Sequence, residues 1–283
     1  MFYGLAAALG WGLADFGAAV AGRRLGSVAT AFVSQAVTAL AMTVFFVAGH
    51  HRLSELGPIA GWVVVSGAVS SSAYLAHYRA LELGPVAVVS PIGAAYALVG
   101  LALAIALLGE RPGAVALVGG VVTVVGVMLS STNLRGLTTG TRAAAGPGVR
   151  WALVSMVLFG VGAFFLGWFA QRVGWVPGLW ASRVAQLAGL TMVATVRRSH
   201  VRRPRAGRAV GAAALVGAAD LLGVVAYSAG AAAGFVSIVL VASAVFPLVT
   251  IALAIPLLGE RPVANQYLGV ALVVVGLLML GLG

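Results

Sequence analysis

One twelve-residue segment occurs twice in this chain, 150 positions apart. LALAIALLGERP at 101–112 returns as IALAIPLLGERP at 251–262, with ten of the twelve residues identical. The same spacing relates Gly84 to Gly234 further upstream. A fixed internal period indicates one structural unit present in two copies. We therefore predict two similar halves, each ending in an apolar helix, a GERP corner and a further apolar helix.

The composition predicts that both halves lie in a membrane. Of 283 residues, 61% are hydrophobic and 8% are charged, and the mean hydropathy is +1.09. Soluble domains carry about 25% charged residues, so this chain is predicted to be an integral membrane protein. The sequence has no cysteine, which excludes disulfides and thiolate metal sites. The arginines lie between apolar spans. We therefore interpret the net charge of +11 as a determinant of membrane topology and of contact with lipid headgroups, and not as a sign of nucleic-acid binding.

Ten apolar stretches have the length of a membrane span, which requires roughly 20 residues. A linker rich in Gly and Thr at 132–150 separates the first repeat, 1–131, from the second, 151–283. The predicted spans are 2–21, 28–48, 58–80, 84–108, 113–131, 151–171, 176–196, 209–230, 234–258 and 263–282.

Five spans per repeat is an odd number, so the second copy must enter the membrane from the opposite side. The fold class that follows is all-α, with ten transmembrane helices arranged as two inverted five-helix repeats around a central cavity. Such a pair places a substrate site near the bilayer midplane. Most arginines, including the six of 197–208, fall on one side of the membrane under this count. The positive-inside rule therefore places both termini outside the cytoplasm.

Three segments carry a resemblance to a known family. GPVAVVSPIGAAYALVGLALAIALLGERP, GFVSIVLVASAVFPLVTIALAIPLLGERP and the opening LGWGLADF resemble the EamA repeats of the drug/metabolite transporter (DMT) superfamily. The resemblance implies a ten-helix secondary transporter whose cavity is formed by the first four helices of each repeat, with the fifth and tenth as outer supports. It does not identify the solute, since members move amino acids, drugs, nucleotide sugars and other metabolites.

The two repeats differ in their prolines. Pro91 in the fourth span has no counterpart in the ninth, and Pro247 and Pro256 in the ninth have none in the fourth. Proline bends a membrane helix by removing a backbone hydrogen bond and crowding the preceding turn. We therefore expect the fourth and ninth spans to kink at different depths.

Two aspartates lie in the middle of apolar spans, Asp15 in span one and Asp220 in span eight. A charge at the bilayer centre costs about 3 kcal/mol or more, which makes each a candidate functional residue. Because an apolar environment disfavours the charged form of a carboxyl group, either is a candidate for proton coupling. The alternative is a structural carboxyl group hydrogen-bonded to a neighbouring helix.

Arg183 lies about two turns inside span seven. A guanidinium at that depth needs a partner and can form a bidentate contact with a carboxylate or phosphate. It would meet an anionic group of the substrate or pair with Asp15 or Asp220, and structural pairing is the favoured reading. Gln35 is the polar residue near the corresponding position of the first repeat.

Span three carries Tyr74, His77 and Tyr78. Tyr74 and Tyr78 are one turn apart and share a face, whereas His77 points about 100° away from Tyr78. We therefore expect that all three do not line one narrow groove. All three are candidates for substrate binding or coupling, and the favoured alternative is that they anchor the span at the membrane interface.

Aromatic residues are dense in spans one, six, seven and eight. They are candidates for a cage around an apolar or cationic solute, although most aromatics in membrane helices pack or face lipid. The strongest is Trp11, one turn before Asp15 on the same face. The set is Trp11, Phe16, Tyr96, Phe164, Trp168, Trp180 and Tyr227. The GERP corners are interpreted as structural, with Glu110 and Glu260 capping the helix that follows.

These features favour a secondary transporter, an exporter of a small metabolite or drug that works by alternating access. Proton coupling through Asp15 is a subsidiary hypothesis, and a gradient-independent facilitator or exchanger is the alternative within transport. We expect a multi-pass protein of the inner (plasma) membrane of a bacterium, present as a monomer or homodimer. Its partners are a small-molecule substrate, the lipid bilayer and, where coupled, protons.

Other classes of protein are less well supported. An integral membrane enzyme needs a convergent acid/base or metal set, and the six acidic residues are too scattered to supply one. A sensor subunit normally needs a soluble output region, and no stretch is long enough for one. We therefore expect no enzyme, no nucleic acid, no cofactor and no metal site.

Overall fold

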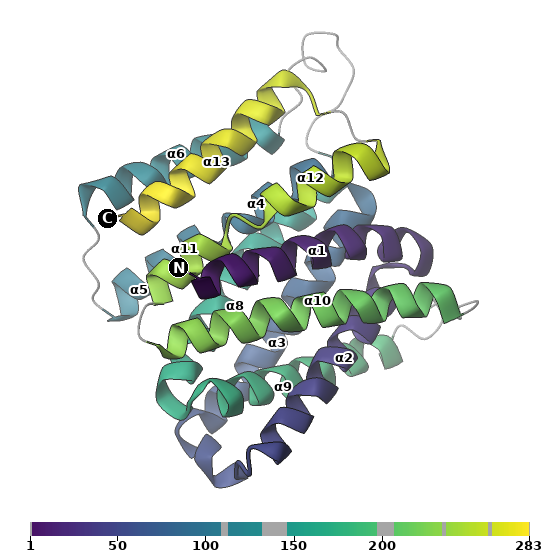
Figure 1. Ribbon diagram of the computed structural model, residues 1–283, viewed down its shortest axis with the longest axis vertical. Helices are drawn as coiled ribbons and strands as arrows, with labels where there is room; N and C mark the ends of the chain where they lie inside the picture. The colour runs from purple at the N-terminus through teal and green to yellow at the C-terminus, as the bar shows by residue number, and fades with distance from the viewer. Residues whose placement is uncertain are drawn as a thin grey trace.

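The computed structural model describes residues 2–108, 113–131, 146–196, 207–233, 236–259 and 262–282. Every regular element in these ranges is a helix, and the helices form one bundle (Figure 1). In chain order they are α1 (Phe2–Leu25), α2 (Ser27–Ala48), the 3-10 helix η1 (Leu53–Ile59), α3 (Ala60–Leu83), α4 (Val86–Ala94), α5 (Tyr96–Leu108), α6 (Ala114–Ser131), α8 (Pro147–Val173), α9 (Trp175–Val196), α10 (Gly207–Ala232), α11 (Val236–Ser243), α12 (Pro247–Leu258) and α13 (Ala264–Leu282).

The helices follow the order of the predicted spans. Within the described residues, six helical segments are long and apolar enough to cross a membrane, and four shorter apolar ones occupy the remaining positions. The six are Phe2–Leu25, Ser27–Ala48, Leu53–Leu83, Pro147–Val173, Trp175–Val196 and Gly207–Ala232, and the shorter ones are Val86–Gly100, Leu117–Gly126, Pro247–Leu258 and Ala264–Met279. The all-helical membrane fold is therefore confirmed.

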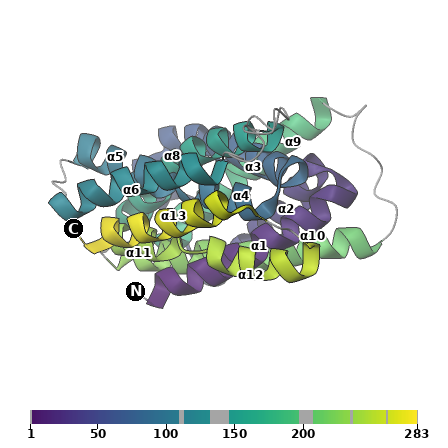
Figure 2. The same ribbon diagram turned by 90° about the horizontal axis from the view of Figure 1, so that it is seen from above.

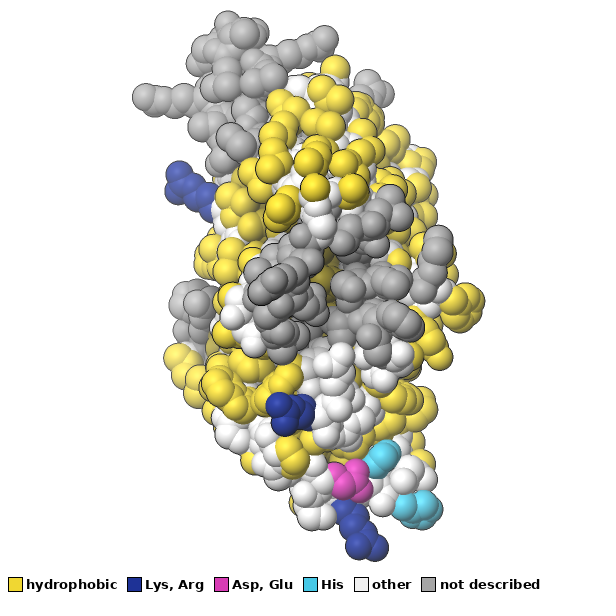
Figure 3. Space-filling model, turned by 90° about the vertical axis from the view of Figure 1, so that its left-hand side faces the viewer, with side chains coloured by type: hydrophobic (Ala, Val, Ile, Leu, Met, Phe, Trp, Pro, Cys, Tyr) yellow, Lys and Arg dark blue, Asp and Glu magenta, His cyan; other side chains and the backbone are white. Residues whose placement is uncertain are grey.

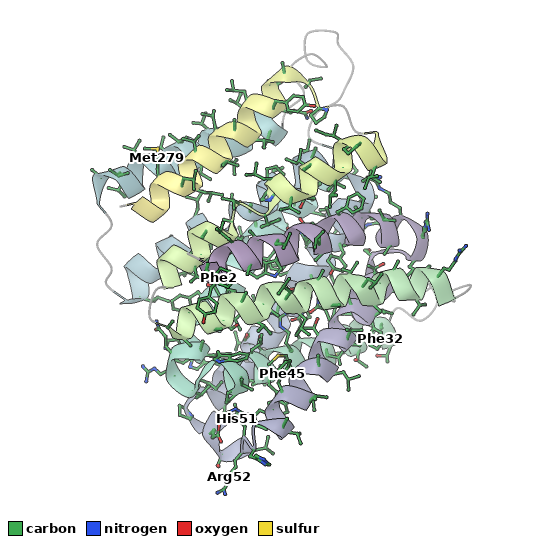
Figure 4. All side chains as sticks on the ribbon, viewed as in Figure 1. Phe2, Phe32, Phe45, His51, Arg52 and Met279 are labelled. Carbon is green, nitrogen blue, oxygen red and sulfur yellow. The ribbon has the colours of Figure 1, made fainter. Side chains whose placement is uncertain are left out.

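The outer surface of the bundle is apolar. Leu40 on α2, Val121 on α6 and Leu215 on α10 are each about two-thirds exposed or more, at 68%, 66% and 73%. Among the described side chains on the face seen in Figure 3, hydrophobic ones far outnumber charged ones. Helices that are apolar outside as well as inside suit a lipid environment rather than water. The side chains of His51 and Arg52 lie together at the connection between α2 and α3 (Figure 4).

Glycines allow the closest helix contacts. A Cβ atom added at Gly10 of α1 would lie 2.5 Å from the backbone nitrogen of Gly223 on α10. One added at Gly126 of α6 would lie 2.5 Å from the backbone nitrogen of Val273 on α13. Small residues let membrane helices approach to this distance. As a result α1 packs along α10, and α6 and α13 form a pair at one edge of the bundle (Figures 1 and 2).

The fourth and ninth spans are each broken once, and the breaks fall at equivalent positions. Helix α4 ends at Ala94 and α5 begins at Tyr96, while α11 ends at Ser243 and α12 begins at Pro247. The helix breaks therefore fall at corresponding positions of the two repeats, although the prolines do not correspond. Pro91 lies inside α4, before the break in the fourth span, and Pro247 is the first residue of α12, directly after the break in the ninth. Glu110 and Glu260, in the GERP corners, lie outside the described residues.

Candidate functional site

A cavity of about 90 Å³ lies inside the bundle. Its walls come from α1, α3, α4, α5, α8, α9 and α10 and from the break between α11 and α12. Its lining residues are Trp11, Ala14, Asp15, Ser70, Tyr74, His77, Tyr78, Gly93, Tyr96, Phe159, Gly162, Ala163, Leu166, Ser182, Arg183, Asp220, Val224, Tyr227 and Phe246. The cavity therefore gathers residues from both halves of the chain, together with every charged residue singled out in the spans.

Asp220 forms one polar cluster with residues of three other helices. Its Oδ1 accepts a 2.7 Å hydrogen bond from the hydroxyl of Tyr74, and its Oδ2 accepts a 3.1 Å bond from Nε2 of Gln35. Thr38 Oγ1 lies 3.5 Å from the same Oδ2. Asp220 is 2% exposed, and hydrogen bonds of this kind are what allow a carboxylate to be buried.

Arg183 belongs to the same cluster. Its Nη1 donates to Gln186 Oε1 at 2.8 Å, to Gln35 Oε1 at 3.1 Å and to the hydroxyl of Tyr74 at 3.3 Å. Asp220 Oδ2 lies 4.0 Å from Nη1, and the guanidinium also lies over the Tyr74 ring at 5.6 Å. Of the two carboxylates considered from the sequence, Arg183 therefore lies beside Asp220. The contact is a loose ion pair linked through neutral side chains.

Asp15 forms a second cluster. Its Oδ1 is joined to Nε2 of His77 by a 2.8 Å hydrogen bond, and its Oδ2 accepts a 2.7 Å bond from Ser90 Oγ. The other ring nitrogen of His77, Nδ1, lies 3.4 Å from Ser155 Oγ. Both members of the pair are buried, Asp15 at 6% and His77 at 3% exposure. The cluster connects α1, α3 and α4 of the first half to α8 of the second.

The residues of α3 correct one expectation. Tyr74, His77 and Tyr78 all line the cavity and are all buried, so they are not interfacial anchors. They also share the cavity although His77 and Tyr78 point in different directions on the helix. The reason is that α3 is surrounded by α1, α4, α8 and α9, so the cavity meets a broad sector of the helix rather than a narrow stripe.

An aromatic wall completes the cavity. Trp11 contacts Tyr227, Tyr96 and Phe246, with ring centroids 5.7, 6.2 and 6.4 Å away. Phe159 stands edge-on to Tyr74 at 5.1 Å. Aromatic surface next to a few polar groups is typical of small-molecule sites.

Four of the aromatic candidates do not line the cavity: Phe16, Phe164, Trp168 and Trp180. Trp180 stacks on Phe46 at 4.2 Å and donates a hydrogen bond to Thr43 on α2. Trp168 contacts Trp62 and Phe169 in a separate apolar cluster. They pack helices together, which is the usual role of aromatic residues in a bundle.

Sequence reasoning missed several polar and aromatic residues of the site. Ser90 and Ser155 complete the Asp15 cluster, and Gln186 completes the Arg183 cluster. Gln186 follows Arg183 by three positions, a spacing that places the two side chains together on a helix and provided a usable signal. The serines gave no such signal, because small polar residues occur throughout these spans.

The site offers hydrogen bonds and charge in an apolar setting. Among the described residues, no group of three or more His, Asp or Glu side chains is placed to hold a metal ion. Both clusters instead cross between the halves of the chain: Gln35 and Tyr74 meet Arg183 and Asp220, and His77 meets Ser155. A change in either cluster would therefore alter how the halves pack.

Comparisons with known proteins support a membrane transport fold. Residues 1–132 match the model of the EamA-like transporter family. A solved crystal structure, described only as that of a protein, is 18% identical with a TM-score of 0.68 and covers 99% of this chain and 96% of its own. At that identity it shows a shared fold and no more. None of the curated proteins searched matches the chain. Over residues 1–132 this chain is therefore similar to the EamA-like transporter family, which is consistent with a membrane transporter.

Proposed function

We propose that the protein is a secondary transporter that exports a small metabolite or drug across the plasma membrane of a bacterium. The observation that carries the proposal is the cavity, where Asp15, Asp220 and Arg183 meet inside an otherwise apolar bundle. Buried charges in a membrane are costly and mark solute or ion pathways. Alternating access would arise from movement of residues 1–131 against residues 151–283, with the cavity between them.

The proposal includes an inverted relation between these two repeats, which matched contacts support. A Cβ atom at Gly12 of α1 would lie 2.8 Å from the carbonyl oxygen of Phe246, at the break in the ninth span. A Cβ atom at Gly160 of α8 would lie 2.8 Å from the carbonyl oxygen of Tyr96, at the break in the fourth span. Each first helix therefore packs on the broken helix of the other repeat. Repeats related by a two-fold axis make reciprocal contacts of this kind, and an inverted-topology pair is one such arrangement.

Polar contacts within each repeat also correspond in part. His77 of α3 is bonded to Asp15 of α1. At the corresponding place Tyr227 of α10 donates a 3.3 Å hydrogen bond to the backbone oxygen of Ala163 on α8. The ionisable pair therefore exists in the first repeat, and the second repeat has a neutral substitute. This asymmetry supports Asp15 with His77 as the place where a proton would be bound and released.

A reconstitution experiment tests transport itself. Purified protein is first screened by thermal shift against amino acids, nucleotides, sugars and cationic drugs, because a bound ligand raises the unfolding temperature by mass action. Stabilising solutes are then tested for counterflow in proteoliposomes. We expect counterflow of at least one of them, and no flux of any stabilising solute would contradict the proposal. Depletion of a solute by the detergent-purified protein would instead favour a membrane enzyme.

The Asp15→Asn variant tests proton coupling. We expect it to abolish flux driven by a pH gradient while the protein remains folded, because an amide cannot take up the proton. Glu55→Gln, in the connection between α2 and α3, is the matched control and should leave that flux unchanged. Flux that is driven equally well by the gradient in Asp15→Asn would eliminate the coupling hypothesis. Counterflow that is independent of a pH gradient in the unaltered protein would favour the alternative, a facilitator or exchanger.

A further inference from the structure

Arg183 has hydrogen-bonding capacity that the protein does not use. The side chain is 5% exposed and lines the cavity. Its three hydrogen bonds to described residues all leave from Nη1, and Nε has no partner among those residues. A buried charged donor without a partner is costly. An acceptor supplied by a ligand would remove that cost.

By contrast, the two carboxylates that line the cavity have a hydrogen-bond donor at each oxygen. Asp15 accepts one hydrogen bond on each oxygen, from His77 and from Ser90. Asp220 likewise accepts on each oxygen, from Tyr74 and from Gln35. The donor that remains unsatisfied therefore belongs to the guanidinium, and the matching ligand group is an anionic acceptor rather than a cation.

The geometry of the guanidinium also suits a carboxylate. Asp220 approaches Arg183 at one atom only, with 4.0 Å between Nη1 and Oδ2, so the forked edge that carries Nε is not engaged by it. A carboxylate matches that edge with two parallel hydrogen bonds. Resting on the transport function proposed above, we propose that Arg183 binds the carboxylate of a small organic acid whose apolar body lies against Trp11, Tyr227 and Phe246.

The volume and charge of the cavity refine the ligand class. At about 90 Å³ the cavity is small beside the roughly 300–1,000 Å³ of most ligand pockets, so in this conformation it favours a carboxylate on a short chain. The charged groups that face it are Asp15 on α1, Asp220 on α10, Arg183 on α9 and, when protonated, His77 on α3. With neutral His77 they sum to −1, so a bound carboxylate would be accompanied by a proton.

A pairwise ligand comparison tests the assignment. Purified protein is titrated with propionate, butyrate and benzoate and with the amide of each, at ionic strength matched with sodium chloride. We expect at least one acid to bind about tenfold or more tightly than its amide, because a hydrogen bond to a charged group is worth about that factor. Equal binding of every acid and its amide, or no binding by any acid, would overturn the assignment.

Variants test whether the preference for an acid over its amide depends on Arg183. The double change Arg183→Gln with Asp220→Asn removes both charges together and leaves no unpaired buried charge, and it should abolish the preference for the acid. Arg79→Gln, at an exposed ion pair with Glu82, is the control and should retain it. If the double variant does not fold, Arg183→Lys keeps the charge without the fork and should reduce the preference. A preference that is unchanged in the folded variant would overturn the proposal.

The outcomes separate this inference from the transport function. Counterflow of a neutral or cationic solute with no acid binding would leave transport standing and overturn the carboxylate site. Acid binding that depends on Arg183, with no flux of any solute, would support the carboxylate site and contradict transport.

Discussion

At the scale of single residues, Tyr74 is the side chain that joins the charges of the larger cluster. Its hydroxyl donates to Asp220 at 2.7 Å and accepts from Arg183 at 3.3 Å. A hydroxyl can do both at once, whereas the side chains of Asp and Arg each only accept or only donate when charged. Tyr74 therefore holds the acid and the base near each other without a direct short contact between them.

Removing that hydroxyl should destabilise the protein measurably. We expect Tyr74→Phe to lower the free energy of unfolding by about 1–3 kcal/mol, because a buried carboxylate and a buried guanidinium each lose a hydrogen bond. Tyr267→Phe on α13 is the control, since Tyr267 is 47% exposed, and its change should be close to zero. Unfolding of both variants in detergent provides the measurement. Equal stability of the two would show that the hydroxyl of Tyr74 does not hold the cluster together.

The site residues that could be predicted from the sequence are the charged ones, because a charge within an apolar span has a visible free-energy cost. Asp15, Asp220 and Arg183 interrupt apolar spans, and a charge there needs a reason. The pairing of Asp15 with His77 could not be predicted, because 62 positions separate them and helix packing alone brings them together. The same limit explains why Trp168 and Trp180 were wrongly grouped with Trp11, since an aromatic side chain looks alike whether it faces a cavity or a neighbouring helix.

At the scale of the helices, hydropathy and length predicted the order and approximate bounds of the apolar helical segments. Span six was predicted over 151–171 and α8 covers Pro147–Val173. The breaks were less predictable, because proline marks a weakened helix without fixing which turn opens. Pro256 lies inside α12 and does not end it, while the break precedes Pro247. In both spans the break brings an aromatic residue to the cavity, Tyr96 in one and Phe246 in the other.

The pair formed by α6 and α13 gives a prediction at this scale. Substituting Gly126→Ala would place a Cβ atom 2.5 Å from Val273 N and 2.7 Å from the carbonyl oxygen of Gly269. The helices would have to separate, and we expect a loss of about 1–3 kcal/mol of stability, as for other overpacked contacts. Neither helix contributes a lining residue to the cavity, so ligand affinity should stay the same.

Gly211→Ala on α10 is the matched control for that experiment. A Cβ atom there meets nothing within 4 Å, and alanine is favoured over glycine in a helix by up to about 1 kcal/mol. Thermal unfolding should therefore show Gly126→Ala below the unaltered protein and Gly211→Ala at or slightly above it. A Gly126→Ala variant as stable as the unaltered protein would mean that this helix contact is not close in solution.

At the scale of the whole molecule, the size of the cavity bears on how the protein works. Ligand pockets usually enclose roughly 300–1,000 Å³, well above the 90 Å³ of this cavity. A solute larger than a short-chain acid would require the two halves to move apart. Because both polar clusters bridge the halves, that movement would break or rearrange the hydrogen bonds of Asp220 and the contact of His77 with Ser155. Ligand binding and opening are thereby linked through the same residues.

Membrane orientation is the remaining property of the whole molecule, and the arginines predict it. Helix α1 begins and α13 ends on the same side of the bundle, and Arg23 and Arg24 lie at the other end of α1 (Figure 1). The positive-inside rule places the arginine-rich side in the cytoplasm.

Since the chain has no cysteine, a single introduced cysteine reports one position. We expect a membrane-impermeant maleimide to label Leu53→Cys in η1 in intact cells, and to label Gly207→Cys at the start of α10 only after lysis. Both positions are exposed, so accessibility does not limit labelling. The reverse pattern would show the opposite orientation, with the arginine-rich face of the proposed exporter outside the cell. Labelling of both positions in intact cells would indicate two orientations in one membrane.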